Sequence, residues 1–287
     1  MPKIEIIPVH SINELSILLS ENDCRIIAGG IAIRDEMGTV DSKIRKLIDI
    51  SPLHEQLSFI RFKGNRIEIG ALTSVEEIFV SPILQTFSPA LIRAIASWES
   101  RASCSQATIG GSLAYRSLFD ASIPVMIIHN AKIRIKTIND FHEIEMDHFL
   151  SQSPKYRLKE DEFIFSVSFR KPQGFWGSSW SSIVDERDNS SIQAAAMISL
   201  DEEQKISAAR IAVQQKGRMV FRARAVEKFI IENHVDELQI ENAVSNVKKD
   251  IPSSAVNPPL NIMESVLKTV LADSLKQANT FQKNYDM

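Results

Sequence analysis

Cysteine is scarce in this sequence: Cys24 and Cys104 are the only two among 287 residues. Two thiols exclude a disulfide scaffold, and they exclude any iron–sulfur cluster or zinc site that takes four cysteines from this chain. They fit a reducing compartment, so we expect a cytoplasmic protein. Cys104 is best interpreted as a small buried residue, with a reactive thiol as the alternative.

Long apolar runs and an excess of basic charge are also missing. No window approaches the roughly 18 continuous apolar residues that a membrane-spanning helix needs. The segment that starts at Met1 lacks the apolar core of a signal peptide. The net charge is −3 and no basic stripe stands out, which argues against nucleic acid as the main partner.

The sequence also lacks a cluster of catalytic side chains. Its six histidines are scattered, and no spacing among them indicates a metal site or a catalytic triad. The acidic run at 160–162 is typical of a solvated turn. We therefore expect neither a catalytic residue nor a metal ligand from this chain.

The pattern of apolar residues divides the chain into three parts. A hydrophobic content of 44% is typical of a globular protein. Short strands and capped helices predict an α/β part at residues 1–55, in which Pro8 stops the first strand and Ser11 caps a helix. A second part at 56–172 has a hairpin around Gly64, a capped helix start at 73–77 and a strand of alternating apolar residues at 162–169. After a break at Pro172, the remainder predicts an α+β part. Its expected elements are strands at 192–200, 206–213 and 219–221 and helices at 224–232 and 261–278, the second capped by Asn261. This last part is poor in glycine, so we expect no catalytic loop in it.

Two pairs of adjacent glycines are the most informative feature of the sequence. Gly29 and Gly30 end a predicted strand, and Gly110 and Gly111 lie in Ala107-Thr108-Ile109-Gly110-Gly111-Ser112-Leu113-Ala114. Glycine accepts a positive φ and leaves its backbone N–H exposed, and successive exposed N–H groups bind anions. We predict that the second pair forms a turn, and that the two pairs hold the two phosphates of a dinucleotide. The alternative is two ordinary tight turns of an α/β fold.

Four segments carry a resemblance to a known family. They are Ala28-Gly29-Gly30, Ile69-Gly70-Ala71-Leu72-Thr73, Ala107-Thr108-Ile109-Gly110-Gly111 and Asp161-Glu162-Phe163-Ile164. In order and spacing they resemble the FAD-binding medium subunit of molybdenum hydroxylases, the xanthine dehydrogenase and carbon monoxide dehydrogenase group, over nearly the whole chain. The resemblance implies an α+β fold with a two-subdomain FAD-binding α/β unit of the PCMH type. Subdomain 1 would cover residues 1–55, subdomain 2 residues 56–172, and a C-terminal α+β domain residues 173–287.

FAD is the cofactor that this resemblance implies, bound between the first two subdomains with its pyrophosphate on both glycine pairs. The implied cofactor-binding residues are Ala28, Gly29, Gly30, Ile31, Ala32, Ile33, Trp98, Thr108, Ile109, Gly110, Gly111, Ser112, Asp120 and Ile164. The resemblance further implies an oxidoreductase subunit with no substrate-oxidising site of its own. Electrons would arrive from an iron–sulfur subunit and leave through FAD to an acceptor such as NAD or a quinone. The iron–sulfur subunit and a molybdenum-cofactor subunit would be other chains.

Side chains at four positions depart from the family pattern. Ile31 replaces a polar residue and Ser112 an asparagine. Ala121 stands where the family has an aspartate, with Asp120 one residue early, and Ser182 stands in place of a lysine. Each lost hydrogen bond costs about 0.5–1.5 kcal/mol, so several losses weaken FAD affinity. Two alternatives stay open: a degenerate FAD site in a structural or assembly subunit, and a site for another nucleotide in the same cleft.

Overall fold

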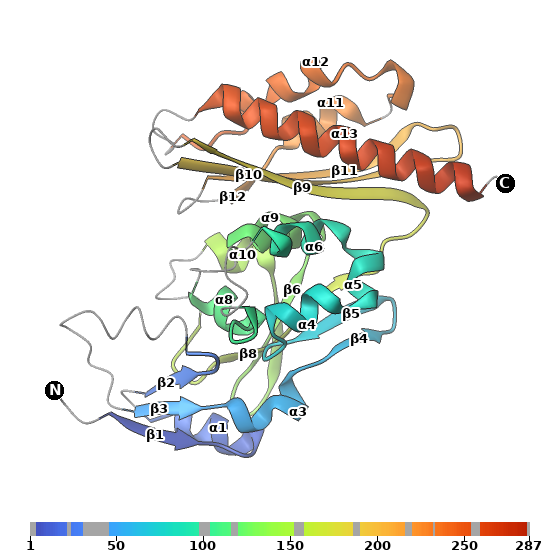
Figure 1. Cartoon of the computed structure of the whole chain (residues 1–287). Helices are drawn as coiled ribbons and strands as arrows, with labels where there is room; N and C mark the ends of the chain where they lie inside the picture. The colour runs from blue at the N-terminus through green and yellow to red at the C-terminus, as the bar shows by residue number, and fades with distance from the viewer. Residues whose placement is uncertain are drawn as a thin grey trace. The chain divides into compact units, whose positions relative to one another are not determined.

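The computed structural model describes residues 4–21, 24–30, 46–97, 104–115, 120–151, 158–185, 190–215, 220–231, 233–253 and 259–285 (Figure 1). The chain forms two compact units. Unit 1 comprises Met1–Ile83, Trp98–Phe119 and Asn130–Arg170, and unit 2 comprises Leu84–Ser97, Asp120–His129 and Lys171–Met287. Within the described ranges, no helix has the length and apolar character to cross a membrane. Separate sheets with their own helices confirm the α+β class.

A small parallel sheet opens unit 1, with the strand order β1-β3-β2. Its strands are β1 (Glu5–Pro8), β2 (Cys24–Ile27) and β3 (Lys46–Asp49). Helix α1 (Ile12–Leu19) follows β1, and the Ser11 hydroxyl caps it by accepting the N–H of Glu14 at 3.1 Å, as predicted. Pro8, predicted to stop the first strand, is its last residue, which an edge strand tolerates.

The second sheet of unit 1 is antiparallel, with the order β4-β5-β8-β6-β7. Its strands are β4 (Ile60–Lys63), β5 (Arg66–Gly70), β6 (Lys132–Lys136), β7 (Phe141–Glu145) and β8 (Phe163–Arg170). The helices of this region are α3 (His54–Leu57), α4 (Val75–Val80), α8 (Ile109–Tyr115) and α10 (Met146–Ser151). The hairpin prediction is confirmed, since Gly64 joins β4 to β5 with φ of +60°.

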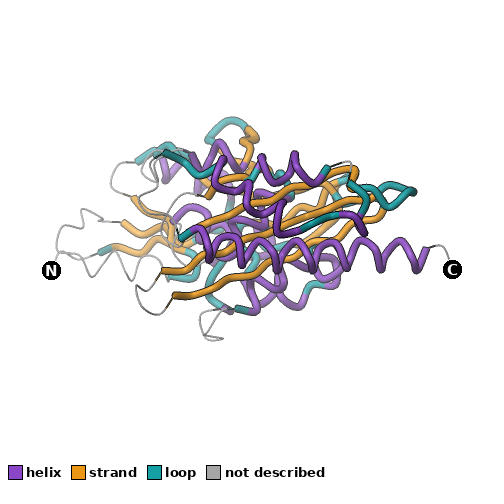
Figure 2. The backbone as a smooth tube through the Cα atoms, turned by 90° about the horizontal axis from the view of Figure 1, so that it is seen from above, coloured by secondary structure: helices purple, strands orange, loops and turns teal. Residues whose placement is uncertain are grey.

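Unit 2 is built on a four-stranded antiparallel sheet with the order β12-β11-β10-β9. Its strands are β9 (Phe175–Asp185), β10 (Ser190–Leu200), β11 (Ile206–Gln215) and β12 (Val220–Arg222). Helices α11 (Arg224–Ile230), α12 (Ile240–Val244) and α13 (Leu260–Tyr285) lie on one side of it. Helices α6 (Pro89–Ala96), which follows α5 (Pro82–Phe87), and α9 (Ile123–Ile128) lie on the other. Figure 2 shows α13 as one long helix that runs along the strands.

The structure departs from the sequence prediction in several elements. Strands β7 and β9 were not predicted, and β9 is rich in serine and lacks a clear apolar alternation. Packing against α13 defines β9: a Cβ on Gly177 would lie 2.1 Å from the carbonyl oxygen of Ser274. Helix α13 begins at Leu260, so Asn261 lies inside it and does not cap it. The domain boundaries at residues 55 and 172 remain predictions, while residues 84–97 and 120–129 join unit 2.

Candidate functional site

The second glycine pair lies in a helix. Ile109–Tyr115 forms α8, so the prediction of a turn at Gly110 and Gly111 is wrong. The N–H of Gly110 was predicted to be exposed, but it donates to the carbonyl oxygen of Ala71 at 2.9 Å. A Cβ on Gly110 would lie 2.7 Å from the Cβ of Ala71. Glycine is required here because the helix packs directly on the Ala71 backbone.

Backbone pairing joins this glycine segment to the segment that follows β5. The N–H of Val75 donates to the Ala107 carbonyl at 2.9 Å, and the N–H of Ile109 donates to the Thr73 carbonyl at 3.1 Å. The buried Thr73 hydroxyl is itself fixed, because it accepts the N–H of Phe59 and donates to the Phe59 carbonyl, both at 3.1 Å. The second and third motif segments are therefore paired to one another.

The first glycine pair, at the end of β2 in the small parallel sheet, contacts the chain just before α8. A Cβ on Gly29 would lie 1.6 Å from the carbonyl oxygen of Gln106, so the two backbones are in direct contact. Gly30 follows with φ of +73°, a conformation that favours glycine. No hydrogen bond within the described residues uses the N–H of Gly29 or Gly30. As far as the described part of the chain shows, these two N–H groups are candidates to bind a ligand.

The fourth motif segment completes the arrangement through β8. The N–H of Ala71 donates to the Phe165 carbonyl at 3.0 Å. Ile164 precedes Phe165 and is buried. Backbone contacts within unit 1 thus join the four quoted segments, two of them through a neighbouring residue: Gln106 directly precedes the third segment and Phe165 directly follows the fourth. Sequence reasoning had no signal for Gln106 or the Phe165 carbonyl, because both act through backbone atoms that any residue type supplies.

Polar groups at the start of α8 complete the candidate site. The Thr108 hydroxyl accepts the N–H of Gly111 at 3.2 Å, and the N–H of Ser112 donates to the Thr108 carbonyl at 3.0 Å. Gly111 is exposed, whereas the Ser112 side chain is buried. The available donors are neutral backbone and hydroxyl groups beside a helix start, an arrangement that suits a phosphate. It offers no general base and no nucleophile.

Several predicted site residues fall elsewhere. Ile31, Ala32, Ile33 and Trp98 lie outside the described residues. Asp120 begins the short 3-10 helix Asp120–Ser122 of unit 2, and Ser182 lies in β9. Ala28 packs against the core of the small parallel sheet. Within the described ranges, no group of three or more His, Cys, Asp or Glu side chains is arranged to hold a metal ion.

A serine–histidine pair that the sequence did not indicate lies in unit 2. The hydroxyl oxygen of Ser88 is 2.8 Å from Nε2 of His129. Such a pair resembles a nucleophile and its base, but both side chains are buried. Burial, with a contribution from the charge of Arg210, lowers the pKa of His129 to about 3. An imidazole of that pKa is too weak a base for catalysis near neutral pH, so the pair is structural.

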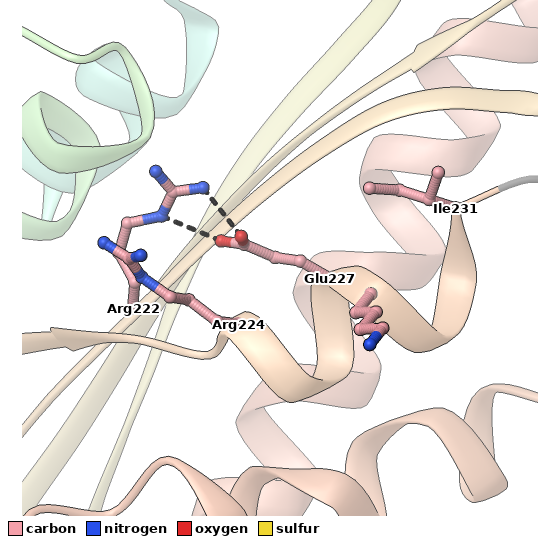
Figure 3. A pocket seen from close by; sticks show the side chains of 5 residues that line it. Arg222, Arg224, Glu227 and Ile231 are labelled. Atoms are coloured by element: carbon pink, nitrogen blue, oxygen red, sulfur yellow. Dashed lines mark hydrogen bonds and ion pairs between the residues drawn. The ribbon is translucent and has the colours of Figure 1, made fainter.

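A second concave surface lies in unit 2, at the junction of β12 and α11 (Figure 3). Its volume is about 480 Å³, and Arg222, Arg224, Glu227, Lys228 and Ile231 line it. Glu227 is neutralised in place, since Arg222 donates to its two carboxylate oxygens at 2.9 and 2.7 Å. The ion pair fastens β12 to α11. None of the four motif segments contributes to this surface.

Comparison with known proteins gives consistent matches. Residues 2–171 match the family described as the FAD binding domain in molybdopterin dehydrogenase, and residues 184–258 match the CO dehydrogenase flavoprotein C-terminal domain. The chain is 25% identical to the 6-hydroxypseudooxynicotine dehydrogenase complex subunit alpha of Paenarthrobacter nicotinovorans, over 96% of this chain and 95% of that protein. It is 27% identical to the carbon monoxide dehydrogenase medium chain of Hydrogenophaga pseudoflava, over 62% of each.

The fold is likewise that of solved structures. A chain of quinoline 2-oxidoreductase from Pseudomonas putida 86 superposes with a TM-score of 0.84 at 20% identity, over 96% of this chain and 98% of that one. A chain of the carbon monoxide dehydrogenase from Hydrogenophaga pseudoflava gives 0.81 at 20% identity, over 96% and 98%. The resemblance drawn from the four motif segments and the fold it implied are confirmed.

Proposed function

This chain belongs to the family of FAD-binding domains in molybdopterin dehydrogenases, and on that premise we propose that it is an electron-transfer subunit. It would take electrons from an iron–sulfur subunit and pass them through FAD to an acceptor such as NAD or a quinone. The iron–sulfur subunit and a molybdenum-cofactor subunit would be separate chains of a cytoplasmic complex. When bound, FAD supplies the link between one-electron and two-electron transfer.

The observation that carries this proposal is the convergence of the four motif segments. Gly29 touches Gln106, Thr73 and Val75 pair with the segment around α8, and Ala71 binds β8. Among the described residues, none accepts the N–H groups of Gly29 and Gly30, which lie next to a helix start with a hydroxyl at Thr108. No catalytic group is needed at such a site, because the cofactor carries the chemistry and the protein supplies position and electrostatics.

The residues present fit a diphosphate. Gly29 and Gly30 would donate their N–H groups to it, and Thr108 and Gly111 would approach it from the start of α8. Gly110 has a different role from the one predicted, because its N–H is already bound to Ala71. It allows the helix to lie close enough for Thr108 and Gly111 to reach the ligand. Ile164 would lie near the cofactor as a buried apolar residue.

The names of the relatives support a role within a complex. One is the alpha subunit of a dehydrogenase complex, one is the FAD-subunit of a nicotinate dehydrogenase from Eubacterium barkeri, and one is a medium chain. A cytoplasmic location would agree with the thiols, because no disulfide joins Cys24 and Cys104.

The test is the visible absorption spectrum of the purified chain before and after FAD is added. Flavin bands that stay with the protein through desalting are the expected result. A chain that remains colourless with FAD far above micromolar concentration would refute the proposed cofactor role for the isolated chain. Mass spectrometry of any bound ligand separates FAD from another nucleotide.

A structural or assembly subunit with a degenerate site is the second candidate. One observation favours it: the Gly110 N–H, which was expected to bind phosphate, is already hydrogen-bonded to the carbonyl oxygen of Ala71. Ser112 in place of an asparagine, and Ile31, Ala121 and Ser182, remove further side-chain contacts that the family pattern would supply. Under this alternative the chain would co-purify with partner subunits and would contain no flavin.

A further inference from the structure

One face of the antiparallel sheet in unit 1 is strongly basic. Besides the buried Lys136, whose amino group donates to the carbonyl oxygens of Thr137 and Ile138, the strand register places six cations and three carboxylates on it. Their net charge is +3, and they are Arg61, Lys63, Arg66, Lys132, Arg134, Arg170, Glu68, Glu143 and Glu145. The opposite face is apolar, with Ile67, Ile133 and Val167 buried. The whole chain has a net charge of −3. We call these nine residues the basic face.

Glu68 lies at the centre of the basic face and is shared by three cations. Arg61 donates to its Oε2 at 3.1 and 2.9 Å, and the amino group of Lys63 and a guanidinium nitrogen of Arg134 are each 3.9 Å from Oε1. The Ser166 hydroxyl donates to Oε1 at 2.9 Å. Burial favours the neutral acid, but the bonds from Arg61 and Ser166 outweigh it, so the pKa of Glu68 is lowered. One buried carboxylate therefore leaves two positive charges of this cluster uncompensated.

Aromatic rings hold the two arginines in fixed positions. The guanidinium carbon of Arg61 lies 4.0 Å from the centre of the Phe59 ring, and that of Arg134 lies 4.1 Å from the centre of the Phe141 ring. Stacking of this kind orders the side chain before any partner arrives. The three rings Phe59, Phe141 and Phe165 are themselves only partly buried. Arginine and aromatic residues are the types enriched where protein interfaces gain most of their affinity.

A second concentration of like charge lies at the edge of this cluster. Arg66 and Arg170 are directly opposite one another on β5 and β8. Arg66 donates to the hydroxyl and carbonyl of Ser168 at 3.1 and 2.8 Å, with no carboxylate in either bond. Like charges opposite one another in a sheet are destabilising in the isolated protein. An acidic surface placed against them would remove that cost.

We propose that the basic face docks an acidic surface of a partner subunit. The inference rests on the proposed function for the existence of the complex, and it adds where on this chain the contact is made. The cations spread over four strands, or roughly 14 Å at the usual strand spacing, which is too wide for one small anion. A sheet face presents them on one surface, as a protein partner requires. Nucleic acid is disfavoured because the rest of the chain is acidic.

The test exchanges two exposed cations of the basic face for acids. The double variant Lys63→Glu/Arg170→Glu keeps the hydrogen bonds from Arg61 and Ser166 to Glu68 and gives up the ion pair of Lys63 with that carboxylate. It also removes the like-charge repulsion between Arg66 and Arg170. A matched variant, Lys228→Glu/Lys276→Glu, makes the same change of charge at exposed positions of unit 2. Each full-length chain is co-expressed with its iron–sulfur and molybdenum-cofactor subunits. The association rate and the dissociation constant of the purified subunits are then measured at low and high salt.

We expect the Lys63/Arg170 variant to associate about tenfold or more slowly at low salt, with a weaker dependence on salt. The Lys228/Lys276 variant should match the wild type in association and in melting temperature. The Lys63/Arg170 variant should stay folded but melt lower, because it loses the cation 3.9 Å from the buried Glu68 carboxylate. Equal association rates of the two variants would refute the basic face as a docking site, without contradicting the proposed function. If the wild type binds neither subunit, both are overturned. Tight binding of the wild type to a duplex oligonucleotide, lost in the Lys63/Arg170 variant, would assign the face to nucleic acid instead.

Discussion

Gly29 and Gln106 are in backbone contact, so close that a Cβ on Gly29 would lie 1.6 Å from the Gln106 carbonyl oxygen. The contact fixes the end of β2 against the chain that leads into α8. Small motions of a flexible side chain cannot relieve such an overlap, because the opposing atom belongs to the main chain. The two glycine pairs of the sequence are therefore held together by a contact that tolerates no side chain at position 29.

Gly29→Ala should consequently disrupt the candidate site. The methyl group would push β2 away from Gln106, and overpacking of this kind costs about 1–3 kcal/mol of unfolding free energy or more. We expect a lower melting temperature and loss of flavin uptake, measured by thermal unfolding and absorption spectroscopy. Gly174→Ala is the comparison: no atom lies within 4 Å of its Cβ position, and its φ of +70° adds only backbone strain of about 1–2 kcal/mol, so flavin uptake should persist. Equal losses of melting temperature and of flavin uptake in the two variants would contradict the importance of the contact with Gln106.

The Thr108 hydroxyl is the second point at which the site can be tested. It accepts the Gly111 N–H at 3.2 Å in the manner of a helix cap. Thr108→Val keeps the shape and removes the acceptor, at a cost of about 1 kcal/mol of stability. If the same hydroxyl binds FAD, the affinity should also fall about tenfold, which corresponds to one hydrogen bond. Thr108→Ser should retain both properties. Titration with FAD and thermal unfolding of all three proteins separate the two effects.

Local patterns predicted most elements of the fold. Alternating apolar residues indicated β8, and the serine before Val75 indicated the start of α4, where Ser74 and Glu77 form a capping box. The family resemblance came from segments that are short, local and rich in glycine. Such signals are readable because each depends on residues close together in the sequence.

The misses have a common cause in long-range packing. Strand β9 is defined by the approach of α13 to Gly177, and the sequence of β9 alone has little periodicity. The helix at Gly110 is set by the Ala71 backbone, so its glycines serve close packing and not a turn. The contact of Gly29 with Gln106 involves a main-chain oxygen, so the type of residue at position 106 does not reveal it. Side-chain patterns predicted which segments matter, but not how their backbones meet.

The buried imidazole of His129 predicts a dependence of stability on pH. Burial lowers the pKa of His129 to about 3 in the folded protein, against an ordinary value near 6.5. Below pH 6.5 the unfolded chain binds a proton that the folded chain does not, so stability falls as the pH falls. The slope from this group approaches about 1.4 kcal/mol per pH unit and ends near pH 3. In His129→Gln, denaturant titrations between pH 6.5 and 5 should show a smaller slope. An unchanged slope would contradict a neutral His129.

Two ion pairs of unit 2 have nearly the same length but different surroundings. Arg93 and Asp273 join α6 to α13 with a nitrogen–oxygen distance of 2.6 Å, and their side chains are 49% and 39% exposed. Arg222 and Glu227 are 2.7 Å apart, with 20% and 9% exposed. Oε1 of Glu227 also accepts the N–H of Ile211 at 2.8 Å. Distance alone would predict equal contributions of the two pairs to stability, whereas the difference in burial predicts unequal ones.

Neutralising one acid of each pair should therefore have unequal effects on stability. Asp273→Asn should cost at most about 1 kcal/mol, because solvent screens the pair. Glu227→Gln should cost about 3 kcal/mol or more, since Arg222 would keep its charge without a counter-ion. The amide can replace only one of the two carboxylate oxygens that now accept hydrogen bonds. Urea unfolding of both variants at neutral pH measures the difference. The stability difference between the wild type and each variant is then measured again at high salt. If salt reduces the difference for Glu227→Gln more than the difference for Asp273→Asn, burial does not govern the contribution of Glu227.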